Sequence, residues 1–148
     1  MRAGGGYDPD ALIYMRAVEN ADGQSLEYPV KAAINTYVVT LKADSVWTSV
    51  AQLLLPCGPR TLAGALKPLK GTAPTNVNFV SGDYNRENGL GKASNSNAYL
   101  NSNVAVNSVG ATSHAYFAYG SIAASSGDII LMGGYDGTTQ ASLIVLDE

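Results

Sequence analysis

From residue 71 to residue 90 the chain reads GTAPTNVNFVSGDYNRENGL, and this stretch marks a change of architecture. Nine of the chain's eleven asparagines lie between residues 71 and 110. Asparagine, glycine and serine favour turns, because their side chains bond the local backbone or leave it free to bend. The residues before this stretch carry helical patterns instead. We therefore expect an α+β fold, in which short N-terminal helices precede an antiparallel β-sandwich.

The same change of composition divides the chain into three parts. Residues 1–57 are expected to form a helical segment for attachment or oligomerisation. Residues 58–75 are rich in proline and glycine, and we expect an irregular connector with at most one helical turn. Residues 76–148 are expected to form the β-sandwich domain.

Local signals mark the first helix at both ends. Asp8 can accept the free N–H groups of the first turn, Pro9 suits the first helical position, and Asp10 complements the helix dipole. Gly23 is placed to end the helix in a left-handed cap. Between these ends, apolar residues recur at helical spacing, so one face is expected to be buried.

Two further helices are expected before Pro56. The second begins between Ser25 and Pro29 and carries a broad apolar stripe. The third is expected to start at Asp44. Helices this short bury too little to be stable alone, so their stripes need the β part or another subunit as a cover. The residues expected to pack the helices together or against a neighbouring copy are Val30, Ile34, Tyr37, Val38, Leu41, Trp47, Val50 and Leu54.

The second half of the chain shows short strands separated by glycine-rich turns, which is typical of an antiparallel sandwich. The expected strands cover residues 77–81, 98–100, 104–106, 114–122, 128–132 and 141–146. Gly82-Asp83 and Asp136-Gly137 are expected turns, and Gly133-Gly134 is expected to end the strand at 128–132.

The charge of the chain favours assembly over binding to nucleic acid. Charged residues make up 14% of the sequence, below the roughly 25% usual for soluble domains, so little repulsion keeps copies apart. The net charge is −3, and after Gly71 only Arg86 and Lys92 are basic. Phosphate binding needs clustered lysine and arginine, and we expect no nucleic-acid partner.

The sequence also lacks an apolar run long enough to span a membrane, so no membrane span is expected. The N-terminus has no apolar signal core, and synthesis in the cytoplasm is expected. Cys57 is the only cysteine, and we expect a buried structural thiol. His114 is the only histidine, which disfavours a catalytic triad or a histidine metal site.

Several segments resemble a family of bacteriophage virion proteins. The resemblance rests on RTLAGAL (residues 60–66), GTAPTN (71–76), NFVSGDYNR (78–86) and Gly89-Leu90, and it extends to INTYVV (34–39) and YLNSN (99–103). In that family a helical segment precedes a jelly roll like those of concanavalin and laminin-G domains. The family's β domain continues for more strands than this sequence holds. Either this is a short member, or neighbouring chains complete an open sheet edge.

The resemblance implies a structural component of the virion, in a tail, a fibre or a head decoration. Its partners would be copies of itself, as a homo-oligomer, and other virion proteins. The alternative is a carbohydrate-recognition module of a tail fibre that binds host glycans through Tyr84, Tyr99, Tyr116 and Tyr135. The structural component is the favoured interpretation.

Laminin-G-like jelly rolls often hold calcium, so a calcium ion is the one cofactor considered. Its candidate oxygen ligands are Asp83, Asn85, Asn88 and Asp136, of which only two carry charge. A glycosidase would need two carboxylates facing a cleft, and turn formation accounts better for the available carboxylates. We therefore expect no metal site, no cofactor and no enzymatic activity.

Overall fold

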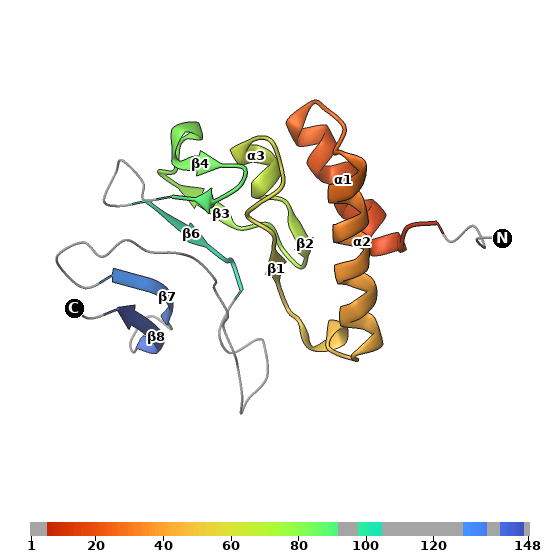
Figure 1. Cartoon of the computed structure of the whole chain (residues 1–148). Coiled ribbons are helices and arrows are strands. Elements are labelled where there is room, and N and C mark those ends of the chain that lie inside the picture. Colours follow the sequence, from red (N-terminus) through yellow and green to blue (C-terminus); the bar gives the residue numbers. More distant parts are fainter. Residues whose placement is uncertain (1–5, 92–97, 105–128, 136–139, 147–148) are drawn as a thin grey trace. The chain divides into compact units, whose positions relative to one another are not determined.

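A computed structural model describes residues 6–91, 98–104, 129–135 and 140–146. The chain forms two compact units, Met1–Asn103 and Val104–Glu148, each of which is described by itself. Helices and antiparallel two-stranded ladders make up the described residues (Figure 1), so the expected α+β class is confirmed.

Helix α1 (Pro9–Asp22) begins and ends as its sequence predicts. The Asp8 carboxylate accepts a hydrogen bond from the Asp10 N–H at 2.9 Å, and Pro9 occupies the first turn. Gly23 adopts a left-handed conformation with φ of 65°, and its N–H donates to the Glu19 carbonyl. The helix therefore has a polar cap at each end.

Helix α2 (Tyr28–Ala43) is also confirmed, but the expected third helix is wrong. Asp44 does not cap a new helix, because its N–H donates to the Thr40 carbonyl and ends α2. A single 3-10 turn, η1 (Trp47–Ser49), follows, and the chain then extends as β1 (Leu53–Leu54). Strand β1 pairs with β2 (Pro68–Lys70), so the backbone of Leu53 and Leu54 finds its partners on a distant strand. This tertiary pairing overrides the local helical preference of the segment.

The connector holds more structure than its composition suggests. Besides β2 it contains the one-turn helix α3 (Leu62–Ala65), in which the Thr61 hydroxyl accepts the Gly64 N–H at 3.1 Å.

The 3-10 turn η2 (Ser81–Asp83) follows the connector and lies where the Gly82-Asp83 turn is expected.

Two antiparallel ladders complete the first unit. Strand β3 (Thr75–Val77) pairs with β6 (Tyr99–Asn101), and β4 (Tyr84–Asn85) pairs with β5 (Gly89–Leu90). The expected strand at 77–81 is instead β3, which ends at Val77. Asn78 follows with a left-handed φ of 66°, and the Asn76 side chain bonds the backbone of Phe79.

The second unit is described by one hairpin, β7 (Ile129–Tyr135) with β8 (Gln140–Leu146). The strand at 141–146 is confirmed. The strand at 128–132 does not end at Gly133-Gly134, because both glycines pair with β8 through their backbones. The expected strand at 114–122, most of 104–106 and the Asp136-Gly137 turn lie outside the described residues.

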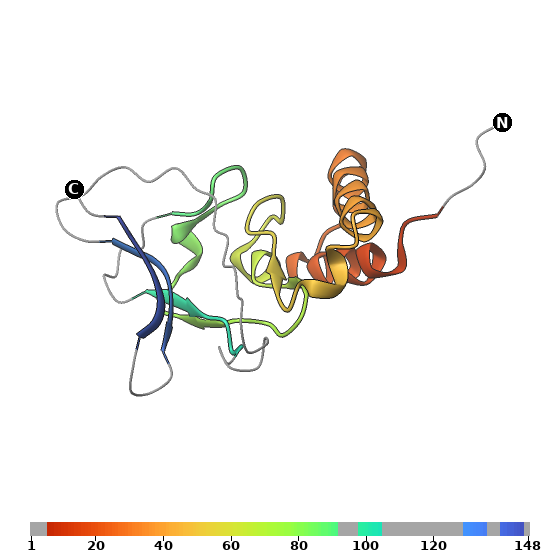
Figure 2. The ribbon, with the colours of Figure 1, turned by 90° about the horizontal axis from the view of Figure 1, so that it is seen from below.

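The core of the first unit lies between α1, α2 and the β1–β2 ladder. α1 is its central element, since it packs against α2, α3 and β2. The buried residues that form this core are Ala11, Tyr14, Met15, Val18, Leu26, Ile34, Val38 and Leu69. Figure 1 and Figure 2 both place α2 at the edge of this unit, on the side away from the β3–β6 ladder.

Cys57 is exposed, which corrects the expectation of a buried thiol. The reason is that this loop contacts the rest of the unit through its backbone. The neighbouring Gly58 exchanges hydrogen bonds with Arg86, from its own N–H to the Arg86 carbonyl and from the Arg86 Nε–H to its own carbonyl. The thiol between Pro56 and Gly58 is left at the surface.

Candidate interaction surface

The exposed side of α2 is unusual for a surface helix, because it carries no charge. The structure describes every residue of α2, and all of its exposed positions are uncharged. Three of them are large: Tyr28 is 71% exposed, Tyr37 41% and Val39 46%. We call this surface the outer face of α2, and its exposed residues are Tyr28, Pro29, Ala33, Thr36, Tyr37, Val39, Thr40 and Ala43.

The two charged residues of α2, Lys31 and Lys42, come one turn after Tyr28 and Val39 and lie beside one edge of this face, where they hold α1. The Lys31 Nζ lies 2.6 Å from a Glu19 carboxylate oxygen. The Lys42 Nζ contacts Asp8 at 2.7 Å and Asp10 at 2.5 Å. The ammonium of Lys42 thereby lowers the pKa of Asp8, and Lys31 lowers the pKa of Glu19. Lysines of a surface helix normally point into the solvent, but both lysines of α2 form ion pairs along the contact between α1 and α2. We call this contact the seam.

Hydrogen bonding strengthens the same seam. The Asn35 side-chain oxygen accepts the Asp8 backbone N–H at 2.6 Å. The Lys42 ammonium also lies 5.4 Å from the centre of the Trp47 ring. These contacts fix the rotation of α2 about its own axis, and therefore fix which residues form its outer face.

The packing residues expected from sequence divide between the two sides of the helix. Ile34 and Val38 are buried in the chain's own core, and Val30 and Trp47 pack against it. Of the set expected on α2, Tyr37 alone is exposed. Leu41, Val50 and Leu54 are partly buried. The sequence analysis did not select Tyr28 or Val39, although the lack of charge around them is readable from the sequence.

A cluster of charges joins the helices to the β4–β5 ladder. Glu27, just before α2, receives Arg60 Nη2 at 2.5 Å and Arg86 Nη1 at 2.9 Å, and its second oxygen pairs with Arg86 Nη2. Hydrogen bonding to Arg86 is the main cause that lowers the pKa of Glu27 to about 2. With every charge paired, we interpret this cluster as structural.

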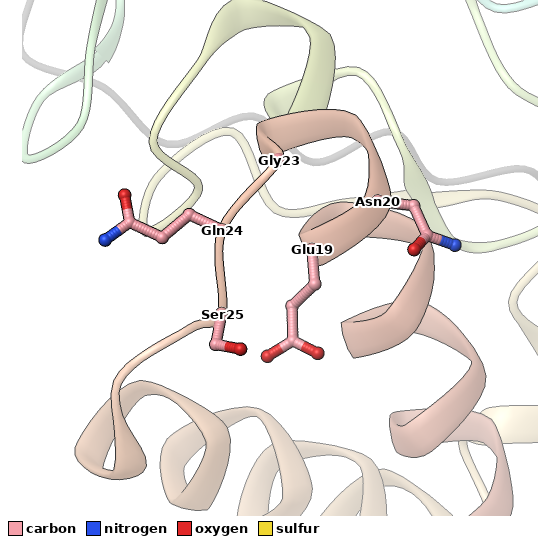
Figure 3. A pocket seen from close by; sticks show the side chains of 5 residues that line it. All are labelled: Glu19, Asn20, Gly23, Gln24 and Ser25. Carbon is pink, nitrogen blue, oxygen red and sulfur yellow. The ribbon is translucent and has the colours of Figure 1, made fainter.

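An open hollow of about 420 Å³ lies at the turn between α1 and α2 (Figure 3). Its lining is polar and consists of Glu19, Asn20, Gly23, Gln24 and Ser25. The Glu19 carboxylate that faces it is already held by Lys31 and by the Leu26 N–H at 2.8 Å. The lining contains no aromatic ring on which a sugar could stack, so this hollow offers little to a ligand.

The four calcium candidates do not converge in the part of the chain that the structure describes. The buried Asp83 carboxylate accepts the Val80 N–H at 2.9 Å, which caps η2. The Asn85 oxygen accepts the N–H groups of Glu87 and Asn88 in the β4–β5 turn. Asp136 lies outside the described residues. Among those residues, no group of three or more His, Cys, Asp or Glu side chains could hold a metal ion.

Two of the four candidate glycan tyrosines, Tyr84 and Tyr99, lie in the described part of the first unit. Tyr84 donates its hydroxyl to the Pro59 carbonyl at 2.6 Å, and burial raises its pKa to about 12. Tyr99 on β6 is 55% exposed, beside Val77 on β3. Tyr116 lies outside the described residues. Tyr135 ends β7, in the second unit.

Among the described residues, no helix is long and apolar enough to cross a membrane, as expected. Comparison with protein-family models, with curated proteins and with solved structures finds no match. The outer face of α2 is therefore the feature from which a function is best argued.

Proposed function

We propose that this chain is a non-enzymatic structural subunit of a larger assembly, in which a neighbouring protein covers the outer face of α2. The observation that carries the proposal is the absence of charge from every exposed position of this helix. The solvent side of a surface helix normally carries charged residues, whereas the side of α2 that faces away from its own unit carries none. A covering protein would remove Tyr28, Tyr37 and Val39 from water.

The assembly proposed is a bacteriophage virion, and the chain's place in it is a tail, a fibre or a head decoration. This part of the proposal rests on the sequence resemblance described above. In the proposed architecture, α1 and α2 attach the subunit, and the residues beyond the connector form a displayed jelly-roll-like β-sandwich. The antiparallel ladders of both units are compatible with such a domain.

Placing a charge on the outer face tests the proposal. Val39→Lys puts an ammonium where a neighbour would have to bury it unpaired, so the variant should be lost from purified particles. Mass spectrometry of particles made with each variant measures this incorporation. Val80→Lys is the matched control, since Val80 is 58% exposed and lies outside the helical segment that is proposed to attach the subunit. Equal incorporation of Val39→Lys and the wild-type chain would refute the proposal.

A glycan-binding module is the second candidate, and the exposed ring of Tyr99 favours it. The Tyr99 ring lies on β6, which ends at Asn101. The side-chain oxygen of Asn101 accepts the Asn103 N–H at 3.0 Å just after the strand. A flat exposed aromatic ring beside amide groups is a common sugar platform. A glycan array with the wild-type chain and Tyr99→Ala separates the candidates, because a purely structural subunit gives no signal with either protein.

A further inference from the structure

We propose that Asn88, in the turn between β4 and β5, is a site of spontaneous deamidation, at which the backbone nitrogen of Gly89 attacks the side-chain amide. Asparagine is chemically labile, and a following glycine favours the reaction because it places no side chain beside the attacking nitrogen. Asn88 is the one asparagine of the sequence that a glycine follows. This inference is independent of the proposed function.

The structure leaves the Asn88 side chain free to react. Asn88 is exposed, and its side-chain amide has no hydrogen-bond partner among the described residues. Other asparagines are held in place: the side-chain oxygen of Asn85 accepts the Glu87 N–H at 2.8 Å, and that of Asn35 accepts the Asp8 N–H at 2.6 Å. A side chain held in this way must give up its hydrogen bond before its Cγ can reach the next backbone nitrogen. Asn88 has no such bond to break.

The pair Asp22-Gly23 shows how the fold can protect a similar sequence. An aspartate before glycine can close the same ring, but here both reacting groups are engaged. The Asp22 carboxylate accepts three hydrogen bonds, from the Arg60 N–H and from the N–H and hydroxyl of Thr61. The Gly23 N–H donates to the Glu19 carbonyl at the end of α1. The reaction is therefore expected at Asn88 rather than at this pair.

The reaction has two steps. In the first, a bond forms between the Gly89 nitrogen and the Asn88 Cγ, and the side-chain nitrogen leaves as ammonia with the proton of the Gly89 N–H. In the second, water opens the resulting cyclic imide. Attack of water at Cγ gives aspartate, whereas attack at the main-chain carbonyl of residue 88 gives isoaspartate, whose backbone is longer by a methylene group. Either product carries a carboxylate that is ionised at neutral pH.

The isoaspartate product should disturb a turn that has little room. Gly89 is buried and pairs with Asn85 across the ladder, and a Cβ at Gly89 would lie 3.3 Å from the Pro56 carbonyl oxygen. A longer backbone does not fit such close packing without a shift of the turn. The same turn carries Arg86, whose guanidinium bonds Glu27 just before α2. Formation of isoaspartate should therefore weaken this link and lower the stability of the first unit.

Mass spectrometry of the purified chain during incubation in a mildly alkaline buffer tests the site. Trypsin releases residues 87–92 as one peptide, in which Asn88 is the sole asparagine. This peptide should lose its amide with time and give two products, aspartate and isoaspartate, that reversed-phase chromatography separates. Asn20 is the internal control, because it is exposed but lies within α1, where the next N–H is bonded along the helix. The tryptic peptide 17–31 should keep its amide over the same time.

Two results would overturn the assignment of the site. One is an amide at Asn88 that persists in the folded chain but is lost from the same chain in urea, because the turn would then protect it. The other is loss at Asn20 as fast as at Asn88.

A second measurement tests the effect on the turn. Asn88→Asp carries the same charge without the longer backbone, so its midpoint of urea unfolding should stay close to that of the wild-type chain. The acidic fraction of incubated protein, isolated by ion exchange, contains isoaspartate and should unfold at a lower urea concentration. Equal midpoints for this fraction and Asn88→Asp would refute the predicted disturbance of the turn.

Discussion

Gly64→Ala is expected to destabilise the first unit, against the preference of the helix in which it lies. Gly64 belongs to α3, and alanine in a helix is favoured over glycine by about 1 kcal/mol. A Cβ atom at this position, however, would lie 2.2 Å from the Asp22 Oδ1 and 2.8 Å from its Cγ. Both distances are shorter than any real contact, so the Asp22 carboxylate would have to move.

Moving Asp22 breaks the link between α1 and α3. Its oxygens accept the Arg60 N–H at 2.7 Å, the Thr61 N–H at 3.0 Å and the Thr61 hydroxyl at 2.7 Å. At roughly 0.5–1.5 kcal/mol for each bond, the loss is roughly 1.5–4.5 kcal/mol. After the gain in helix propensity, Gly64→Ala should lower the free energy of unfolding by roughly 0.5–3.5 kcal/mol.

Urea unfolding of four proteins measures this effect: the wild-type chain, Gly64→Ala, Asp22→Ala and the double variant. With Asp22 already truncated, the clash is gone, and Gly64→Ala should become stabilising by about 1 kcal/mol. The change of sign is the decisive result. If Gly64→Ala stabilised the wild-type chain, or if the two substitutions were simply additive, the proposed contact between Asp22 and Gly64 would be wrong.

Three further predictions concern the core and the charge cluster. Val38→Ala should lower the free energy of unfolding by about 2 kcal/mol, because Val38 is fully buried, whereas Val39→Ala should change it by less than about 0.5 kcal/mol; urea unfolding compares the two neighbours. Tyr14→Phe should raise stability by about 1 kcal/mol, because the buried Tyr14 hydroxyl has no hydrogen-bond partner among the described residues; a lower melting temperature for this variant would show that a partner exists. The folded-state pKa of Glu27 is lowered from 4.5 to about 2, so the stability it contributes is present above pH 4.5 and is lost as the pH falls towards 2. Glu27→Gln should therefore flatten the acid side of a plot of stability against pH, and an unchanged acid slope would contradict this role.

Local signals in the sequence were sufficient for α1 and α2 but not for the segment after them. The cap of α1 depends on Asp8, Pro9 and Gly23, which act on neighbouring residues, so their effect is readable without the fold. The segment around Leu53 is different, because its partner is Lys70, on another strand. A periodic apolar pattern cannot reveal that pairing, and the expected third helix was wrong for this reason. The exposure of Cys57 likewise depends on a contact between Gly58 and the distant Arg86.

The outer face of α2 shows a different limit of sequence reasoning. Both sides of this helix are rich in apolar and small residues, so the apolar stripe alone does not decide which side faces the core. Its two lysines decide it, because Lys31 and Lys42 find their carboxylates on α1 and must lie at that seam. Once the lysines are placed, Val38 is directed into the core and Val39 away from it. Because both lysines of α2 are paired with carboxylates of their own unit, the exposed side of the helix is left uncharged, and this is the observation behind the proposed neighbouring chain.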